Sequence, residues 1–287
     1  MSIAKIIAPL TGGNRDKTVL ASAFVAAKQF SAHVVALYVR PDPRLAVPYI
    51  GAPLSPNVVE GIIDSVQEMN KAAARAARAA LTGIAQAAGV EILASPRKTA
   101  SASCSFREVV GFFPRCVAQE ALLSDLIVFG PVTAADGPDL AEAFLDTLLK
   151  SERPVLLAAE VPASLSGTVA LAWDGSAVAA RALVGAMPFL RQAGKITLLS
   201  CHPAGSRKAR FDDVEEYLAL HGLYCSEEVI DPGKRGIGEA LLEEAVKAGA
   251  HLLVMGGYGH SHLGETLFGG VTQHVRWHAS LPVLMFH

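Results

Sequence analysis

No stretch of this sequence holds 18 consecutive uncharged apolar residues, so nothing in it predicts a membrane-spanning helix. The apolar stretch at the N-terminus is too short for a signal peptide and is not followed by a small-residue cleavage site. A formal net charge of -2 leaves no excess of basic residues that would attract nucleic acid or an anionic membrane. We therefore expect neither nucleic acid nor a membrane as a partner.

Cysteine is scarce, and no two cysteines have Cys-x-x-Cys spacing. The chain has four cysteines, which are Cys104, Cys116, Cys201 and Cys225. Four cysteines could form two disulfides, but a chain of this length can bury a core without them. We expect reduced thiols and a cytoplasmic location.

Aromatic residues are also few, and Ala, Val and Leu supply most of the apolar content. Such a composition is typical of α/β proteins, because parallel strands are buried on both faces and appear as continuous aliphatic runs. A length of 287 residues fits one large domain or two of about 140 residues.

The second half of the sequence repeats landmarks of the first, which decides between one domain and two. Residues 5–13 (KIIAPLTGG) return as residues 168–176 (TVALAWDGS), and each segment precedes an Ala-rich helix, expected at 16–30 and 176–193. Three further pairs follow in the same order: 33–39 with 195–201, 125–130 with 251–256, and the Pro-Val-Leu segments 154–157 with 282–285. Four matching landmarks in one order indicate a duplicated domain.

The alternation of short aliphatic runs with helical stretches predicts a fold of the α/β class. Parallel strands joined by right-handed helical crossovers give a doubly wound, Rossmann-like sheet in each half. A short Pro/Ser/Gly linker at 160–167 divides the chain into domains at 1–160 and 166–287. Ligands of such sheets bind beyond the carboxyl ends of the strands.

A long helix is expected at 58–88, where alanine is abundant. Lys71, Arg75 and Arg78 form a basic stripe along it. An anion-binding face is one interpretation, but a solvated outer face is far more common for such a stripe.

The most informative segment is the glycine-rich stretch at 255–272 (MGGYGHSHLGETLFGGVT), which directly follows an expected strand. Glycine lets the backbone approach a ligand closely, and free N–H groups at a helix start bind phosphate without needing a lysine. The segment is neither a Walker A motif nor Gly-x-Gly-x-x-Gly. A glycine-rich turn alone is often only a turn, but the paired glycines and the helix start at Gly269–Gly270 favour a phosphate site.

This spacing, Gly256-x2-Gly259-x9-Gly269-Gly270, resembles the signature of the universal stress protein family. The resemblance also includes residues 173–176 (WDGS) at the end of the first strand of the repeat and the closing Pro-Val-Leu segment. It spans nearly the whole chain as a tandem pair of domains and implies the fold that is shared with adenine-nucleotide α-hydrolases.

The resemblance implies a site for ATP or another adenine nucleotide, with or without Mg²⁺, in the C-terminal domain. By position, Asp174 and Cys201 would contact the adenosine together with Met255. The phosphate-contacting positions would be Gly256, Gly259, Gly269, Gly270, Val271 and Thr272. The family has Ser or Thr where this chain has Gly270, so one hydroxyl donor is lost while the backbone N–H is kept.

The first half departs further from this pattern. Thr11 stands at the acidic position, and residues 130–137 (GPVTAADG) replace the glycine loop. Pro131 removes a donor N–H, and Asp139 and Glu142 in the expected helix at 139–150 would repel phosphate. We expect this half to be structural or regulatory and to hold no nucleotide.

Other chemistries remain open from the residues alone. His260 with His262, or His274 with His278 on one helical face, could bind zinc, although no glutamate follows the His-Glu-x-x-His pattern. No Gly-x-Ser-x-Gly elbow supports a serine hydrolase. Cys201 could be a nucleophile instead of an apolar pocket residue. Asp174 could cap the helix that follows it.

Two functions from different classes follow. The resemblance implies a nucleotide-binding protein of stress response or signalling, with at most slow ATP hydrolysis, for which Glu265 is a weak candidate base. The rival is a nucleotide-free scaffold that acts through protein contacts. The resemblance also implies a homodimer, or pairing of the two domains within one chain.

Overall fold

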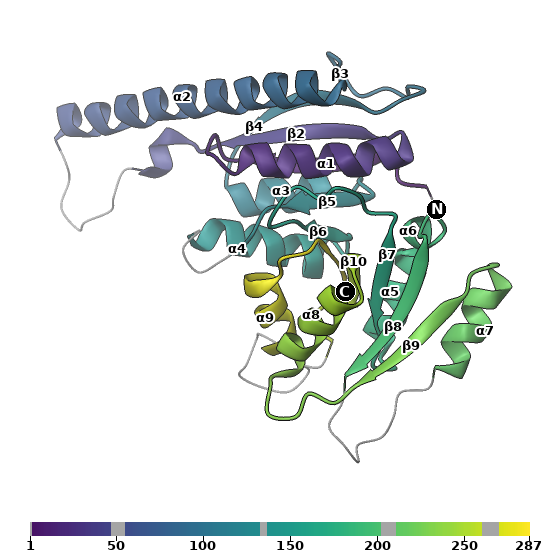
Figure 1. Ribbon diagram of the computed structural model, residues 1–287. Helices are drawn as coiled ribbons and strands as arrows, with labels where there is room; N and C mark the ends of the chain where they lie inside the picture. The colour runs from purple at the N-terminus through teal and green to yellow at the C-terminus, as the bar shows by residue number, and fades with distance from the viewer. Residues whose placement is uncertain (1, 47–54, 133–136, 202–210, 260–269) are drawn as a thin grey trace.

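We describe a computed structural model that covers residues 2–46, 55–132, 137–201, 211–259 and 270–287 (Figure 1). The N-terminal half begins with three alternating elements, and the bounds of the second and third match the expected ones to within a residue. These are β1 (Lys5–Leu10), α1 (Asp16–Phe30) and β2 (His33–Arg40). A short 3-10 turn, η1 (Pro43–Ala46), and the long helix α2 (Pro56–Ala88) come next. The half continues with β3 (Glu91–Ile92), β4 (Ser103–Val110), α3 (Phe113–Ala121), β5 (Leu126–Phe129), α4 (Pro138–Leu145) and β6 (Val155–Leu157).

The C-terminal half repeats the alternation of strands and helices. Its strands are β7 (Thr168–Ala172), β8 (Lys195–Cys201), β9 (Cys225–Ile230), β10 (Ala250–Gly256) and β11 (Val283–Phe286). Its helices are α5 (Ala177–Gly185), α6 (Met187–Leu190), α7 (Asp212–Leu220), α8 (Ile237–Lys247) and α9 (Gly270–His278).

All strands join one continuous sheet, in the order β3-β4-β2-β1-β5-β6-β11-β10-β7-β8-β9. Neighbours within each half are parallel, as predicted. The two halves meet where β6 and β11 pair antiparallel, with Leu156 opposite Leu284. The tandem domains therefore pair with each other within the chain, edge strand to edge strand.

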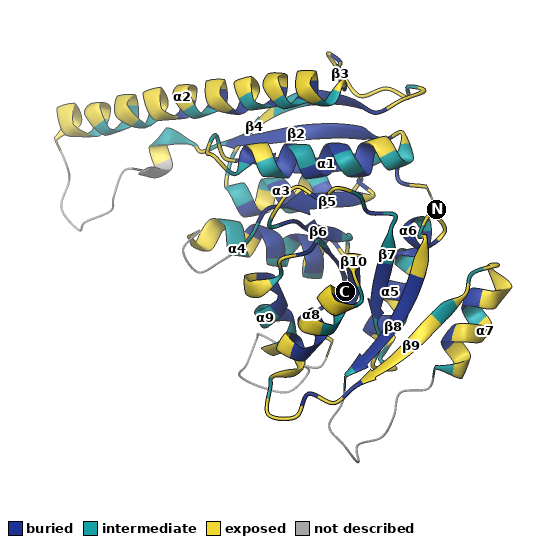
Figure 2. Cartoon of the chain, in the orientation of Figure 1, coloured by how far each residue is buried: buried dark blue, intermediate teal, exposed yellow. Residues whose placement is uncertain are grey.

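The apolar core lies on both faces of this sheet. One face is covered by α1, α2, α5, α6 and α7, and the other by α3, α4, α8 and α9 (Figures 1 and 2). Both core layers cross from one half to the other. On the first face, Phe30 of α1 packs edge-on against Phe189 of α6, with ring centroids 4.9 Å apart. The halves are therefore joined by side-chain packing as well as by the β6–β11 pair.

Two expected helices differ from their predicted course. The helix expected at 176–193 is interrupted at Ala186, where α5 ends and α6 begins, because Pro188 in the first turn of α6 lacks the N–H that a continuous helix would need. The helix expected at 139–150 is α-helical only to Leu145 and continues as a π-helical turn over Asp146–Lys150. Such turns are rare within helices.

Candidate functional site

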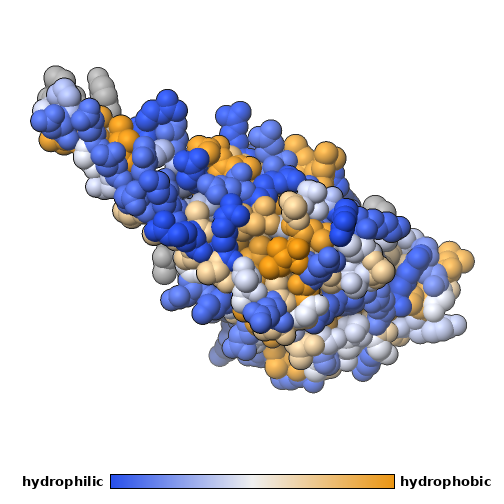
Figure 3. All heavy atoms as spheres, turned by 90° about the horizontal axis from the view of Figure 1, so that it is seen from above, coloured by the Kyte–Doolittle hydropathy of each residue, from blue (hydrophilic) through white to orange (hydrophobic). Residues whose placement is uncertain are grey.

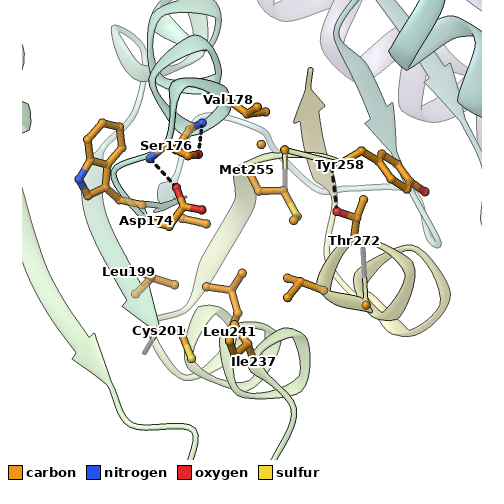
Figure 4. A pocket seen from close by; sticks show the side chains of 17 residues that line it. Asp174, Ser176, Val178, Leu199, Cys201, Ile237, Leu241, Met255, Tyr258 and Thr272 are labelled. Atoms are coloured by element: carbon orange, nitrogen blue, oxygen red, sulfur yellow. Dashed lines mark hydrogen bonds between the residues drawn. The ribbon is translucent and has the colours of Figure 1, made fainter. Parts of the chain in front are cut away.

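A cavity of about 370 Å³ opens at the carboxyl ends of β7, β8 and β10 (Figure 4). The crevice beyond the strand ends is where doubly wound sheets bind ligands. Eight of the nine predicted site residues line it, namely Asp174, Cys201, Met255, Gly256, Gly259, Gly270, Val271 and Thr272. The ninth, Gly269, lies outside the described residues.

Asp174 and Ser176 lie on one side of the cavity, in the turn between β7 and α5. The Ser176 N–H donates to Asp174 Oδ1 at 2.9 Å, so the aspartate closes the turn. Ser176 itself is the N-cap of α5, because its hydroxyl accepts the Ala179 N–H at 3.1 Å. The interpretation of Asp174 as the helix cap is therefore wrong: the cap is Ser176, and Asp174 belongs to the cavity wall.

The opposite wall is apolar. Leu199 and Cys201 from the end of β8 lie beside Ile237 and Leu241 from the first turns of α8, with Met255 of β10 at the base (Figure 4). The flat ring of a nucleobase would fit between such side chains. Ile237 and Leu241 could not be predicted as site residues, because apolar residues at helical spacing look like ordinary core residues.

The Cys201 thiol is an unsuitable nucleophile. Its pKa is raised mainly by burial, with the carboxylates of Asp231 and Glu244 adding to the rise and the Arg235 charge opposing it. The thiolate is the reactive form of cysteine, so a raised pKa leaves this side chain protonated and inert at neutral pH. Like the three other cysteines, it is a free thiol.

Gly256 and Gly259 bring the loop after β10 against the start of α5. A Cβ atom at Gly256 would lie 2.8 Å from Val178 Cγ1 and 3.0 Å from the Val178 carbonyl carbon. At Gly259 it would lie 2.9 Å from Val178 Cγ2. Only glycine fits at these two positions without displacing the loop or the helix.

Tyr258, between these glycines, has a φ of 60°, which is rare for a residue with a side chain. Its N–H donates to Thr272 Oγ1 at 3.3 Å, so the loop is tied to the first turn of α9. Its ring points away from the cavity (Figure 4). Burial raises the pKa of the hydroxyl, so the phenol stays neutral. Thr272 thus holds the residues after β10 against the first turn of α9, which borders the cavity.

The described part of the cavity wall contains little charge. Among the described lining residues Asp174 is the only ionisable side chain other than the protonated Cys201 and the buried Tyr258. Gly270 lies at the start of α9, and a Cβ atom there would meet no atom of the described part of the chain within 4 Å. The N–H groups and the dipole at this helix end are the available donors for an anionic group.

The corresponding turn of the first half is closed. Asp16 accepts the N–H groups of Thr11 and Gly12 at 2.9 and 2.8 Å, and burial raises the pKa of this carboxyl. A Cβ at Gly12 would lie 2.6 Å from the carbonyl oxygen of Ala73 in α2. Helix α2 therefore packs directly on the turn that, in the second half, borders the cavity.

Of the two histidine pairs, only His274 with His278 lies within the described residues, and no third ligand is placed beside it there. The rings of His274 and His278 stack on each other with centroids 4.3 Å apart, and the described residues contain no group of three or more His, Cys, Asp or Glu side chains placed to hold a metal. His260, His262 and Glu265 lie outside the described residues.

This geometry defines a class of protein: a tandem α/β pair in which the second domain has an open crevice bordered by a glycine loop. Residues 166–287 match the family model of the universal stress protein family. The resemblance is thereby confirmed for residues 166–287, which form a universal stress protein domain. The first half lies outside this match and shares only its α/β fold. No curated protein matches the chain.

Solved structures support the fold over nearly the whole length. A universal stress protein of Archaeoglobus fulgidus is 15% identical, with a TM-score of 0.65, and the alignment covers 98% of this chain and 95% of that one. A Pseudomonas aeruginosa protein assigned to the same family is 15% identical, with a TM-score of 0.57 and coverage of 99% and 93%. At these identities the likeness concerns the fold alone. No helix in the described part of the chain has the length and apolar character required to cross a bilayer.

Proposed function

We propose that the C-terminal domain binds one adenine nucleotide, ATP or AMP, in the cavity beyond β7, β8 and β10. The observation that carries this proposal is the convergence of eight predicted residues on one cavity, which has an apolar wall at one side and a helix start at the other. The base would lie between Leu199, Ile237 and Leu241. Asp174 would accept hydrogen bonds from the ribose hydroxyls, since an ionised carboxylate only accepts.

The phosphates would lie against the glycine loop and the N-terminus of α9. Backbone N–H groups would replace the lysine that other phosphate loops use, because Asp174 is the only charged side chain among the described lining residues. A Mg²⁺ ion that accompanies ATP usually keeps several waters and binds substrate phosphates, so it would need few protein ligands here.

In this proposal the protein works by binding rather than by fast catalysis. None of the described lining residues is a carboxylate other than Asp174, which is held in the β7–α5 turn by the Ser176 N–H. The output would be a change in conformation or assembly, in a cytoplasmic stress or signalling response. A ligand can shift such an equilibrium only through its differential affinity for the two states.

The alternative is a nucleotide-free scaffold, and it is supported by Gly270. The hydroxyl of the family signature is absent there, and the first half already has a closed turn. If the same loss has continued in the second half, only protein contacts would remain as a function.

Titration calorimetry of the full chain with AMP and ATP separates the two. The proposal predicts binding that Asp174→Ala and Gly259→Val each abolish, since the valine would collide with Val178 and fill the space of the phosphates. Gly83→Val is the matched control, because a Cβ at this exposed position in α2 meets no atom within 4 Å. Absence of binding to the wild-type chain, or full binding by both site variants, favours the scaffold.

A further inference from the structure

Helix α2 carries six exposed charges whose signs are segregated along its length. They form one line, called here the charge stripe, made of Glu60, Asp64, Glu68, Lys71, Arg75 and Arg78. At about 100° per residue, all six fall within a sector of roughly 80° on the helix surface. The buried side of the helix, which includes Asn70, Ala74, Ala77 and Leu81, faces elsewhere. The stripe is acidic before residue 70 and basic after it.

This order of charges is unfavourable within a single helix. Glu60, Asp64 and Glu68 are spaced by four residues, as are Lys71 and Arg75, and like charges at that spacing repel each other. An ordinary solvated helix gains from opposite charges there instead. The helix dipole does not account for the order, since its influence is limited to the terminal turns and the change of sign lies in mid-helix. One exposed intrahelical pair, Lys71 with Glu68 at 2.8 Å, crosses the change of sign.

The order is self-complementary for two antiparallel copies. A two-fold axis between Met69 and Asn70 would place Glu68 opposite Lys71 of the second copy and Asp64 opposite Arg75. Glu60 would lie within one residue of Arg78. This axis is perpendicular to the plane that contains the two helices, so both charge stripes lie on the same side of that plane. Each acidic segment therefore meets a basic one.

The outward face of α2 leaves room for such a neighbour. Beside the stripe it bears exposed small residues, which are Ala72, Ala76, Ala79 and Gly83. Short side chains allow two helix axes to approach to about 8 Å. Two helices centred on this axis would overlap from Pro56 to Gly83, roughly 42 Å at about 1.5 Å per residue.

The views of the molecule agree with a polar contact rather than an apolar one. Figure 2 shows exposed residues along the outer side of α2 and the helix extending beyond the sheet. In Figure 3 the projecting end of α2 is covered mainly by hydrophilic side chains.

Arg78 is already engaged, because it pairs with Glu108 at 3.3 Å and lies 3.9 Å above the Phe106 ring. The four inner charges therefore carry the specificity.

We propose that this protein forms a symmetric dimer through antiparallel pairing of α2, with the charge stripe of one copy matched to that of a second copy. The contact uses the outer helix of the N-terminal domain. It leaves the β6–β11 pair intact, because that pair lies in the interior of the sheet. The proposal does not depend on nucleotide binding. It gives the N-terminal domain, whose own turn is closed, a function in assembly.

Sedimentation equilibrium on the full chain tests this pairing. The wild-type protein should be dimeric at about 100 μM in about 50 mM salt, and its dissociation constant should rise at least tenfold in about 500 mM salt, since exposed charges are screened. Asp64→Lys/Glu68→Lys and Lys71→Glu/Arg75→Glu should each be monomeric. An equimolar mixture of the two variants should restore a heterodimer.

The control Lys17→Glu/Lys28→Glu makes the same charge change as the second variant on exposed residues of α1, and it should remain dimeric. A monomeric wild-type chain at low salt would overturn the proposal without any variant. So would a dimer that is insensitive to salt, or folded charge variants whose mixture fails to associate.

Discussion

Replacing Gly270 with serine restores the hydroxyl that the family signature has and this chain lacks. The position is suited to a gain of function, because a Cβ there meets no atom of the described residues within 4 Å and the residue lines the cavity at the start of α9. The added side chain therefore collides with none of these residues. Its hydroxyl would face the place proposed for the phosphates.

The expected size of the effect follows from the type of hydrogen bond formed. A hydroxyl that donates to a charged phosphate oxygen contributes about 1.5 kcal/mol or more after desolvation. At about 1.4 kcal/mol for each factor of ten, Gly270→Ser should bind AMP or ATP about tenfold more tightly. Gly270→Ala adds the same Cβ without the hydroxyl and should bind like the wild type.

Titration calorimetry of the three proteins measures this difference directly. Thermal unfolding without nucleotide shows whether serine and alanine change stability alike, so that an effect on the helix is separated from one on the ligand. Equal affinities of the serine and alanine variants, or weaker binding by the serine variant, would contradict a phosphate contact at residue 270. Either result would mean that the start of α9 does not face the phosphates.

Four further changes have definite expected outcomes. Gly256→Ala should lower stability by about 2 kcal/mol in urea unfolding, because its Cβ would overlap Val178, and an unchanged midpoint would contradict this. Gly12→Ala should cost about 3 kcal/mol by the same assay, since φ there is 81° and Ala73 blocks the Cβ. Arg276→Leu should raise stability by about 1 kcal/mol, because the buried Nε and Nη1 atoms have no hydrogen-bond partner among the described residues. A loss of stability would show that the contacts of the guanidinium with Phe144 and Trp277 outweigh the cost of these unpaired atoms. Burial, with the charges of Arg107 and Lys5, lowers the pKa of His33, so its contribution to stability is complete above about pH 6.5 and is lost as pH falls towards the folded-state pKa. His33→Gln should reduce the dependence of the unfolding midpoint on pH between pH 7 and 5. An unchanged dependence would show that His33 does not cause it.

Much of the fold could be predicted because the strands are short, aliphatic and bounded by turn residues. The expected strand at 195–201 is β8, and the expected helix at 16–30 is α1. Pro188 is a local signal for the break in the helix expected at 176–193, because proline lacks the N–H of a continuous helix. Pairing of the two domains within the chain was one of two alternatives that the resemblance implied, but the residues do not show which edge strands pair, since nothing local specifies them.

The site shows the same division between local and tertiary information. The glycine spacing identified the loop, because a close approach of two backbone segments requires glycine, which is visible in the sequence. Val178, Leu199 and Leu241 were missed because a cavity wall and a core use the same apolar residues. The closed turn at Gly12 depends on Ala73, which is far along the chain, and only the folded structure places the two in contact.

Equilibrium dialysis of the full chain against labelled AMP and ATP measures whether the second domain holds a nucleotide. We expect one nucleotide bound per chain and none bound by Asp174→Ala. Retention of no nucleotide by the wild-type chain would contradict the proposed site in the second domain, and retention of two would contradict the closed turn in the first.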